Sequence, residues 1–236
     1  MPSTERLRTV GRRRSLGREV TDALRDMILT GELRSGEPIT HEGIAARLGV
    51  SIMPAREALL QLSHEGLVEA TESRRHRVRA LTRDDLRDVY WVHGTIAGEL
   101  ARRACRNGGA HLAGDLDEVQ AQWEAVIAAG GDPDRLDALN DRFHAVINRA
   151  AGAPKLLLVL RHSLRLIPQH FYALVPSWRE VSTRGHGELV DAIRAGDADA
   201  AERHAREHVL EAGELLTAYF VDSGYWESPA AVAGSA

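Results

Sequence analysis

Residues 40–80 carry the pattern that most constrains what this chain can fold into: two short helices separated by a tight turn, followed by a hairpin. Apolar residues at helical spacing lead to Gly49, where a glycine can take the left-handed conformation that ends a helix. Ser51 then occupies a favourable N-cap position, and Pro54 falls in the first turn of the next helix, where a missing N–H costs little. The pattern predicts a helix-turn-helix.

The second helix of this pattern has two distinct faces. Its apolar stripe should be buried and consists of Ala55, Ala58, Leu59 and Leu62. Its opposite face should point outward and carries Ile52, Met53, Arg56 and Leu60. Gly66 ends the helix, and Leu67–Val68 begins the first strand of a wing. An outward face at this place is the one that a recognition helix lays in the major groove of DNA.

The wing runs from Glu69 to Arg77 and gathers arginines around a reversal of the chain. Such a cluster suits contacts with phosphates or with the minor groove, although a charged hairpin can also be merely solvated. Because the hairpin follows a helix-turn-helix, we expect it to contact DNA. The expected contact residues of the whole segment are Ser51, Ile52, Met53, Arg56, Arg74, Arg75 and Arg77.

This segment resembles the GntR family of bacterial transcription regulators. The matching positions are Gly49, Val50, Ser51, Pro54, Arg56, Glu57, Ala58, Leu59 and Glu65–Val68. The resemblance implies a winged helix-turn-helix that binds double-stranded DNA, with Arg56 as a DNA contact. The chain departs from the family pattern in two places. Ile52 stands where members usually carry an arginine, and arginine and histidine occupy the wing tip, where members usually carry a glycine.

The formal net charge of −4 is divided unevenly along the 236 residues. Residues 1–80 hold 14 arginines against 11 acidic residues, which gives a charge of +3, and the remainder has a charge of −7. The basic part is therefore the part with the DNA-binding pattern. The acidic part is expected to sense a ligand or to form a dimer rather than to offer a second nucleic-acid surface.

The sequence also indicates the compartment. The single cysteine, Cys105, excludes an internal disulfide and fits a reducing cytoplasm. No apolar run approaches the roughly 18 residues that a membrane helix needs, and the N-terminus lacks the apolar segment of a secretory signal. We therefore expect a cytoplasmic protein without a membrane partner.

The chain divides into four expected parts. They are a disordered basic arm over 1–17, a winged helix-turn-helix DNA-binding domain over 18–80, an all-helical effector-binding and dimerisation domain over 81–221, and a disordered tail over 222–236. The expected fold class is mostly α, with the winged helix followed by an antiparallel helical bundle.

Six helices are expected in the C-terminal domain. They run over 82–105, 111–129, 133–150, 154–174, 178–195 and 197–220. ThrArgAspAsp at 82–85 supplies an N-cap followed by first-turn acids, and AsnGlyGly at 107–109 separates the first two helices. The short connections between these segments predict that successive helices are antiparallel.

Three of the eleven histidines fall in phrases that resemble the FCD effector domain of the FadR branch of GntR regulators. The phrases are AsnAspArgPheHis at 140–144, the segment 186–201 that begins HisGlyGluLeu, and ArgGluHisVal at 206–209. Asn140 and His144 lie one turn apart on one helical face. His186 stands ten residues before Gly196 and His208 twelve after it, so two antiparallel helices bring these positions level.

The FCD resemblance implies a divalent metal with a small organic acid as effector at its open positions, and three imidazoles with an amide carbonyl suit Zn²⁺ or Ni²⁺. Carried over residue by residue, the metal ligands are Asn140, His144, His186 and His208. Many members carry Asp at the first of these positions, and the neutral amide of Asn140 leaves the site one unit more positive. The alternative for these histidines is a polar pocket without metal. Further candidates for effector contacts are His93, Arg161 and Arg165.

Together these patterns predict a ligand-responsive transcription regulator, a repressor, that acts as a homodimer on a palindromic operator. Effector binding should change operator affinity by the ~1–3 kcal/mol typical of coupled sites. The alternative is a metal-dependent hydrolase or metal-binding protein that uses the same histidines. An enzyme is not expected, because HisGluGlyIleAla at 41–45 lacks the second histidine of a zinc-protease motif and no carboxylate is evidently placed as a general base.

Overall fold

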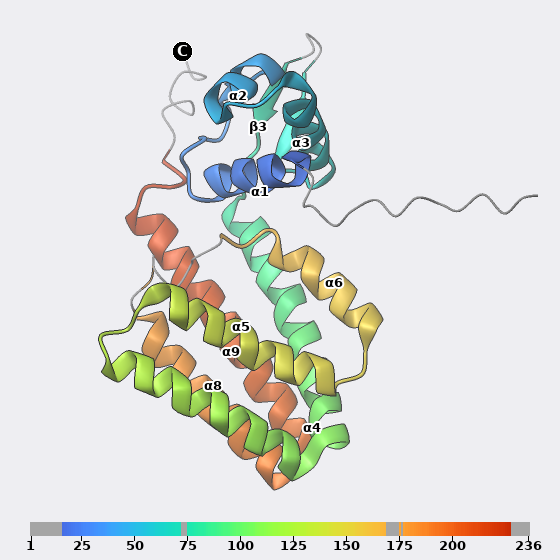
Figure 1. Ribbon diagram of the computed structural model, residues 1–236, viewed down its shortest axis with the longest axis vertical. Coiled ribbons are helices and arrows are strands. Elements are labelled where there is room, and N and C mark those ends of the chain that lie inside the picture. The colour runs from blue at the N-terminus through green and yellow to red at the C-terminus, as the bar shows by residue number, and fades with distance from the viewer. Residues whose placement is uncertain (1–15, 72–74, 169–174, 176, 228–236) are drawn as a thin grey trace, which may run out of the picture. The chain divides into compact units, whose positions relative to one another are not determined.

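The computed structural model describes residues 16–71, 75–168, 175 and 177–227. The chain divides into two compact units, and the boundary lies between Ala80 and Leu81. Within the described residues, the first unit holds three helices and a small sheet, and the second consists of helices (Figure 1). This architecture confirms the predicted fold class, a winged helix followed by a helical bundle. None of the described helices is long and apolar enough to cross a membrane.

The N-terminal unit has the element order of a winged helix-turn-helix. Its sheet is antiparallel, and β3 lies between β1 and β2. The elements are α1 (Leu16–Leu29), β1 (Pro38–Ile39), α2 (His41–Leu48), α3 (Ile52–His64), β2 (Val68–Ala70) and β3 (His76–Val78).

The helix-turn-helix forms for the reasons given by its sequence. Gly49 ends α2 in the left-handed conformation, with φ of 66°. The predicted apolar stripe of α3 is fully buried, as expected for Ala55, Ala58, Leu59 and Leu62. Ser51 is the N-cap of α3, as predicted, and has an extended backbone, although its hydroxyl makes no capping hydrogen bond.

The hairpin between β2 and β3 is the expected wing. Val68 pairs with Val78, and both side chains are buried. Thr71 ties the two strands together where they open, because its backbone N–H and its hydroxyl both donate to the carbonyl of Arg75. Arg74, one of the predicted DNA contacts, lies outside the described residues.

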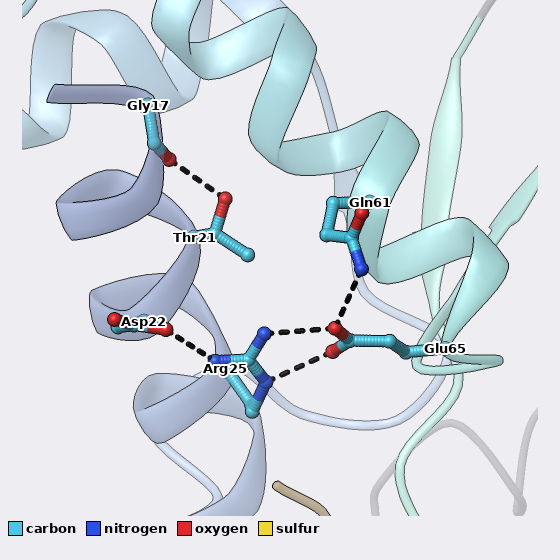
Figure 2. A network of polar contacts seen from close by, with 6 residues as sticks. All are labelled: Gly17, Thr21, Asp22, Arg25, Gln61 and Glu65. Atoms are coloured by element: carbon cyan, nitrogen blue, oxygen red, sulfur yellow. Dashed lines mark hydrogen bonds and ion pairs between the residues drawn. The ribbon is translucent and has the colours of Figure 1, made fainter. Parts of the chain in front are cut away.

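A buried arginine joins α1 to the end of α3. The guanidinium of Arg25 donates to both carboxylate oxygens of Glu65 at 2.9 Å and to Asp22 at 2.6 Å, and Gln61 also donates to Glu65 (Figure 2). Burial alone would lower the pKa of Arg25, but the hydrogen bonds to Glu65 and Asp22 outweigh it and raise the pKa above its usual value. Arg25 is therefore a fixed cation that holds two elements of the DNA-binding unit together.

The C-terminal unit is a helical bundle built around its longest helix. Its described helices are α4 (Arg83–Ala128), α5 (Pro133–Ala150), α6 (Pro154–Leu164), α8 (Trp178–Ala195) and α9 (Ala198–Asp222). The predicted N-cap is present as a full capping box, in which Thr82 accepts from Asp85 N and Asp85 accepts from Thr82 N. Helix α4 packs against α5, α6, α8 and α9, and α8 packs against α9 across the turn at Gly196.

The predicted break between the first two bundle helices is a kink rather than a loop. Only Gly109 leaves the helical conformation, with φ of 49° and ψ of −137°, and α4 continues on both sides of it. Cys105 and Leu112 on either side belong to the same hydrophobic core. The separation predicted at 107–109 was therefore too wide, because one glycine absorbs the whole change of direction.

Helix α6 is shorter than predicted. It ends at Leu164 instead of Leu174, and a turn follows through Ile167. Pro168 explains this end, because proline has no N–H to continue a helix and disfavours the helical conformation in the residue before it. Residues 169–174 of the predicted helix lie outside the described residues.

The predicted disorder of the tail is wrong for residues 222–227. Helix α9 includes Asp222. Beyond it, the Tyr225 ring stacks on Phe220 with centroids 4.1 Å apart, and Trp226 Nε1 donates to the carbonyl of Leu81 at 2.8 Å. The tail was predicted to be disordered because most of its residues are small or polar. Its two aromatic side chains bury enough apolar area to pack against the bundle. Residues 1–15 of the predicted arm and 228–236 of the tail lie outside the described residues.

Candidate metal centre and DNA-contact surface

Three helices bring three histidines together inside the C-terminal unit. His144 comes from α5, His186 from α8 and His208 from α9. Their ring centroids lie 5.0 to 5.6 Å apart, and one nitrogen atom of each lies within 4.8 Å of the others. Residues far apart in the sequence thus form one imidazole cluster, as the register of the last two helices predicts for His186 and His208.

Aromatic neighbours hold the His186 ring in place. It stacks on Phe143 with centroids 3.9 Å apart, and Trp123 lies edge-on at 5.7 Å. His186 is only 1% exposed. A buried ring packed against two aromatic side chains presents its nitrogen atoms in a fixed direction, as a metal ligand should.

Buried polar atoms in this cluster lack protein partners. Among the described residues, His186 Nε2 and His208 Nδ1 are buried and have no hydrogen-bond partner. Buried polar atoms are nearly always paired with protein, water or an ion, and each exception needs an explanation. A ligand between the rings would satisfy these atoms.

The histidines of the cluster are neutral at physiological pH. Burial lowers the pKa of His144 to about 4. Burial, then His144, His93 and Arg184, lowers that of His208 to about 3. The pKa of His186 also falls well below its usual value, through burial and then through the other two rings. Neutral imidazole is the form that binds metal ions.

A pocket of about 460 Å³ opens beside the cluster. His144 and His208 line it, whereas His186 lies behind them, and Asn140 lines it one turn before His144 on α5. Its other polar lining residues are His93, Asp141, Asn148, Arg149 and Arg161. Its apolar lining includes Leu157, Leu160, Leu164 and Trp178. The pocket therefore combines the imidazole edge, two arginines, one carboxyl group and an apolar wall.

The structure brings together most of the residues predicted for this site. Of the three candidate effector contacts, His93 and Arg161 line the pocket and Arg165 does not. Sequence reasoning missed Arg149 and Asn148. Asn148 lies eight residues after Asn140 and four after His144, so it shares their face of α5 and this signal was available. Arg149 instead follows Asp141 and Ala145 at the same spacing, and these two residues also line the pocket.

The donor set fits a divalent metal. Two nitrogen atoms that each lie about 2.0–2.1 Å from a zinc ion are at most about 4.2 Å apart. The cluster spans up to 4.8 Å, so a small inward turn of the rings would seat such an ion. The three imidazoles and the carbonyl oxygen of Asn140 would hold it, and three of these four residues, Asn140, His144 and His208, also line the pocket.

A second surface of interest lies on the N-terminal unit. The side chains of Ile52, Met53 and Leu60 on α3 are more than half exposed, and Arg56 on the same helix is exposed as well. Ser51 precedes them with a hydroxyl that is not used for capping. Soluble proteins seldom expose large apolar side chains next to one another without a partner.

The wing adds described cations to this unit. Arg75 and Arg77 are exposed, although Arg77 also donates to the carbonyl of Gly36 at 2.7 Å, which fixes its position. The predicted DNA-contact residues that lie within the described part of the chain are therefore accessible.

Comparisons with known proteins agree with both units. The model of bacterial regulatory proteins of the gntR family matches residues 16–78, and the FCD domain model matches residues 88–211. A solved structure, that of E. coli McbR/YncC, shares the fold with a TM-score of 0.62 and 21% identity, over 87% of this chain and 99% of that one.

Two relatives extend the similarity along the chain. A probable D-xylose utilization operon transcriptional repressor of Paenarthrobacter nicotinovorans is 31% identical and covers 84% of this chain and 87% of its own length. A putative L-lactate dehydrogenase operon regulatory protein of Escherichia coli (strain K12) is 30% identical, over 83% and 84%. Family and relatives are transcriptional regulators and not enzymes. The chain belongs to the GntR family of bacterial transcriptional regulators and carries an FCD effector domain.

Proposed function

We propose that this protein is a repressor whose C-terminal pocket binds a divalent metal and a small organic acid. The observation that carries the proposal is the cluster of His144, His186 and His208 at the edge of a pocket that also contains Arg149 and Arg161. Neutral nitrogen ligands on one side and cationic side chains on another form a site for a small anion rather than for a neutral molecule.

The proposed ion is Zn²⁺ or Ni²⁺, because both are suited to imidazole ligands. A bound ion of this kind supplies positive charge and open coordination positions for a carboxylate. Asn140 contributes an uncharged oxygen, so none of the four proposed ligands offsets that charge. Arg149 and Arg161 would bind other oxygen atoms of the acid, and the apolar wall at Leu157 and Leu160 would exclude water from its carbon chain.

The names of the relatives agree with control by a small molecule. One is named for D-xylose utilization and the other for an L-lactate dehydrogenase operon. We infer that this protein also controls genes for the use of a small compound, from within the cytoplasm. The cationic pocket favours an acid over a neutral sugar.

The proposal can be tested with the full-length chain and its operator. Elemental analysis after loading with zinc and desalting should find close to one ion per chain. A panel of small carboxylic acids should then contain at least one that changes the affinity for a labelled operator by about 5–150-fold, which corresponds to the usual coupling of ~1–3 kcal/mol. Metal-free protein with an unchanged effector response would mean that the histidines only line a polar pocket.

DNA binding is proposed to use α3 and the wing. The contacts would come from Ser51, Ile52, Met53, Arg56, Arg75 and Arg77, together with Arg74 from outside the described residues. We expect Arg56→Ala to weaken operator binding by about 1–3 kcal/mol if the guanidinium pairs with a guanine. Arg203→Ala is the matched control, because Arg203 is an exposed arginine of α9 and its loss changes the net charge equally. Equal affinities of wild type and the Arg56 variant in a fluorescence titration would remove Arg56 from the interface.

We also propose that the protein acts as a homodimer on a palindromic site. A single winged helix reaches few base pairs, and this chain carries Ile52 where relatives of the family usually carry an arginine. Two copies related by a two-fold axis would read two half-sites. Sedimentation should therefore find a dimer at micromolar concentration, and a monomer both free and on DNA would contradict the proposal.

A further inference from the structure

Gly185 on α8 lies beside His186 in the sequence but faces a different histidine. A Cβ atom at this position would lie 2.7 Å from Nδ1 of His208, 3.2 Å from its Cγ and 3.3 Å from its Cβ. Favourable contacts between non-bonded carbon atoms have separations of about 3.5–4.0 Å. The His208 ring therefore occupies the volume that any side chain at residue 185 would need.

The ring has little room to yield. Two of the three close atoms are the root of the side chain rather than its far end. The ring is also bounded by Trp178, whose centroid is 5.4 Å away, and by His186 at 5.0 Å. A methyl group at residue 185 would therefore turn the His208 ring or push α9 away from α8.

The backbone does not require a glycine here. Gly185 lies inside α8 and is not among the glycines with positive φ. Glycine is one of the poorest helix formers, so a glycine inside a helix needs a packing or functional reason. The open space that Gly185 leaves for His208 is that reason.

We propose that Gly185 is a positioning residue for the metal centre: its missing side chain lets the His208 ring lie against α8, level with His186 and facing His144. This inference rests on the proposed binding of metal by these histidines. If Nδ1 of His208 is the ligand atom, a methyl group 2.7 Å away would crowd the approach of an ion to it. If Nε2 is the ligand atom, the methyl group displaces it by turning the ring.

The first test compares two glycines of the same helix. A Cβ atom at Gly187 would meet no neighbouring atom within 4 Å, so Gly187→Ala is a matched control. Zinc affinity is measured by competition with a chromophoric chelator. We expect Gly185→Ala to weaken zinc binding by about 10–100-fold, the effect of losing a group that orients a ligand, and Gly187→Ala to leave it unchanged. Operator binding by the metal-free proteins should be the same for all three.

The second test removes the ring that the methyl group would meet. Gly185→Ala should lower the thermal unfolding temperature of the wild-type chain by more than that of a His208→Ala background, where the imidazole is absent and only the Cβ at 3.3 Å remains. Equal zinc affinity of wild type and Gly185→Ala would overturn the inference alone, as would an equal loss of thermal stability in both backgrounds. Wild-type protein that binds no zinc would instead overturn the proposed function, and the inference about metal with it.

Discussion

Replacing His186 by alanine is expected to abolish metal binding and the effector response while DNA binding is retained. His186 supplies one of three clustered imidazoles, and its ring packs against Phe143 and Trp123. Loss of a group that only orients a ligand already costs about 10–100-fold in metal affinity. Loss of the ligand itself should therefore exceed about 100-fold. Zinc content after desalting and operator titration with and without the effector measure the two effects.

Two further variants make this result specific. His111→Ala removes an exposed histidine of α4 and should change neither zinc content nor effector response. Asn140→Asp adds an anionic oxygen on the same face as His144 and should strengthen zinc binding, because a carboxylate is a better ligand than an amide. If the His186 variant keeps its zinc, or the Asp variant binds zinc no more tightly, the proposed ligand set is wrong.

Replacing Glu65 by alanine is expected to destabilise the DNA-binding unit by about 3 kcal/mol. Among the described residues, the change leaves the buried guanidinium of Arg25 with Asp22 as its carboxylate partner, and an incompletely paired buried charge is costly. Hydrogen exchange of the full-length chain, followed by mass spectrometry, should show peptides of α1 and α3 exchanging roughly 100-fold faster. Peptides of the C-terminal unit should serve as an internal standard.

Control variants separate charge from packing in this experiment. Glu69→Ala removes an exposed carboxylate a few residues away and should leave exchange unchanged. The double variant Arg25→Met, Glu65→Leu replaces both partners by apolar side chains of similar size. It should recover much of the lost protection, because exchanging a whole buried ion pair for apolar packing is often neutral or better. If the Glu65→Ala variant exchanges its amide hydrogens at the wild-type rate, the Arg25–Glu65 pair does not stabilise the DNA-binding unit.

The fold was predictable where local signals agreed with the tertiary contacts. The end of α2 at Gly49 and the capping box at Thr82 are local features, and both are present in the structure. The errors lie where non-local packing decided. The hydrophobic core continues past Gly109, so two predicted helices are one kinked helix. The Tyr225 ring stacks on Phe220, although the composition of its segment indicated disorder. Neither contact can be obtained from helical periodicity.

The candidate site was partly predictable for a similar reason. The i, i+4 spacing and the short turn at Gly196 place Asn140, His144, His186 and His208 near a common level of the bundle. The cation that the prediction missed, Arg149, follows Asp141 and Ala145 at four-residue spacing on α5, but which helices close over that row depends on the whole bundle. Arg165 was predicted because it follows Arg161 by one turn, yet the helix ends before it and the pocket lies elsewhere.

The aromatic packing around the histidines also gives the protein its own optical reporters. Trp178 lines the pocket and lies 5.4 Å from the His208 ring, and Trp123 lies 5.7 Å from that of His186. Trp226, in contrast, is anchored to Leu81 at the start of the bundle. Indole emission responds to charge and polarity nearby, so the emission of Trp123 and Trp178 should follow ligand binding. Chains that retain only one of these indoles would distinguish events in the pocket from changes where the bundle begins, without any attached dye.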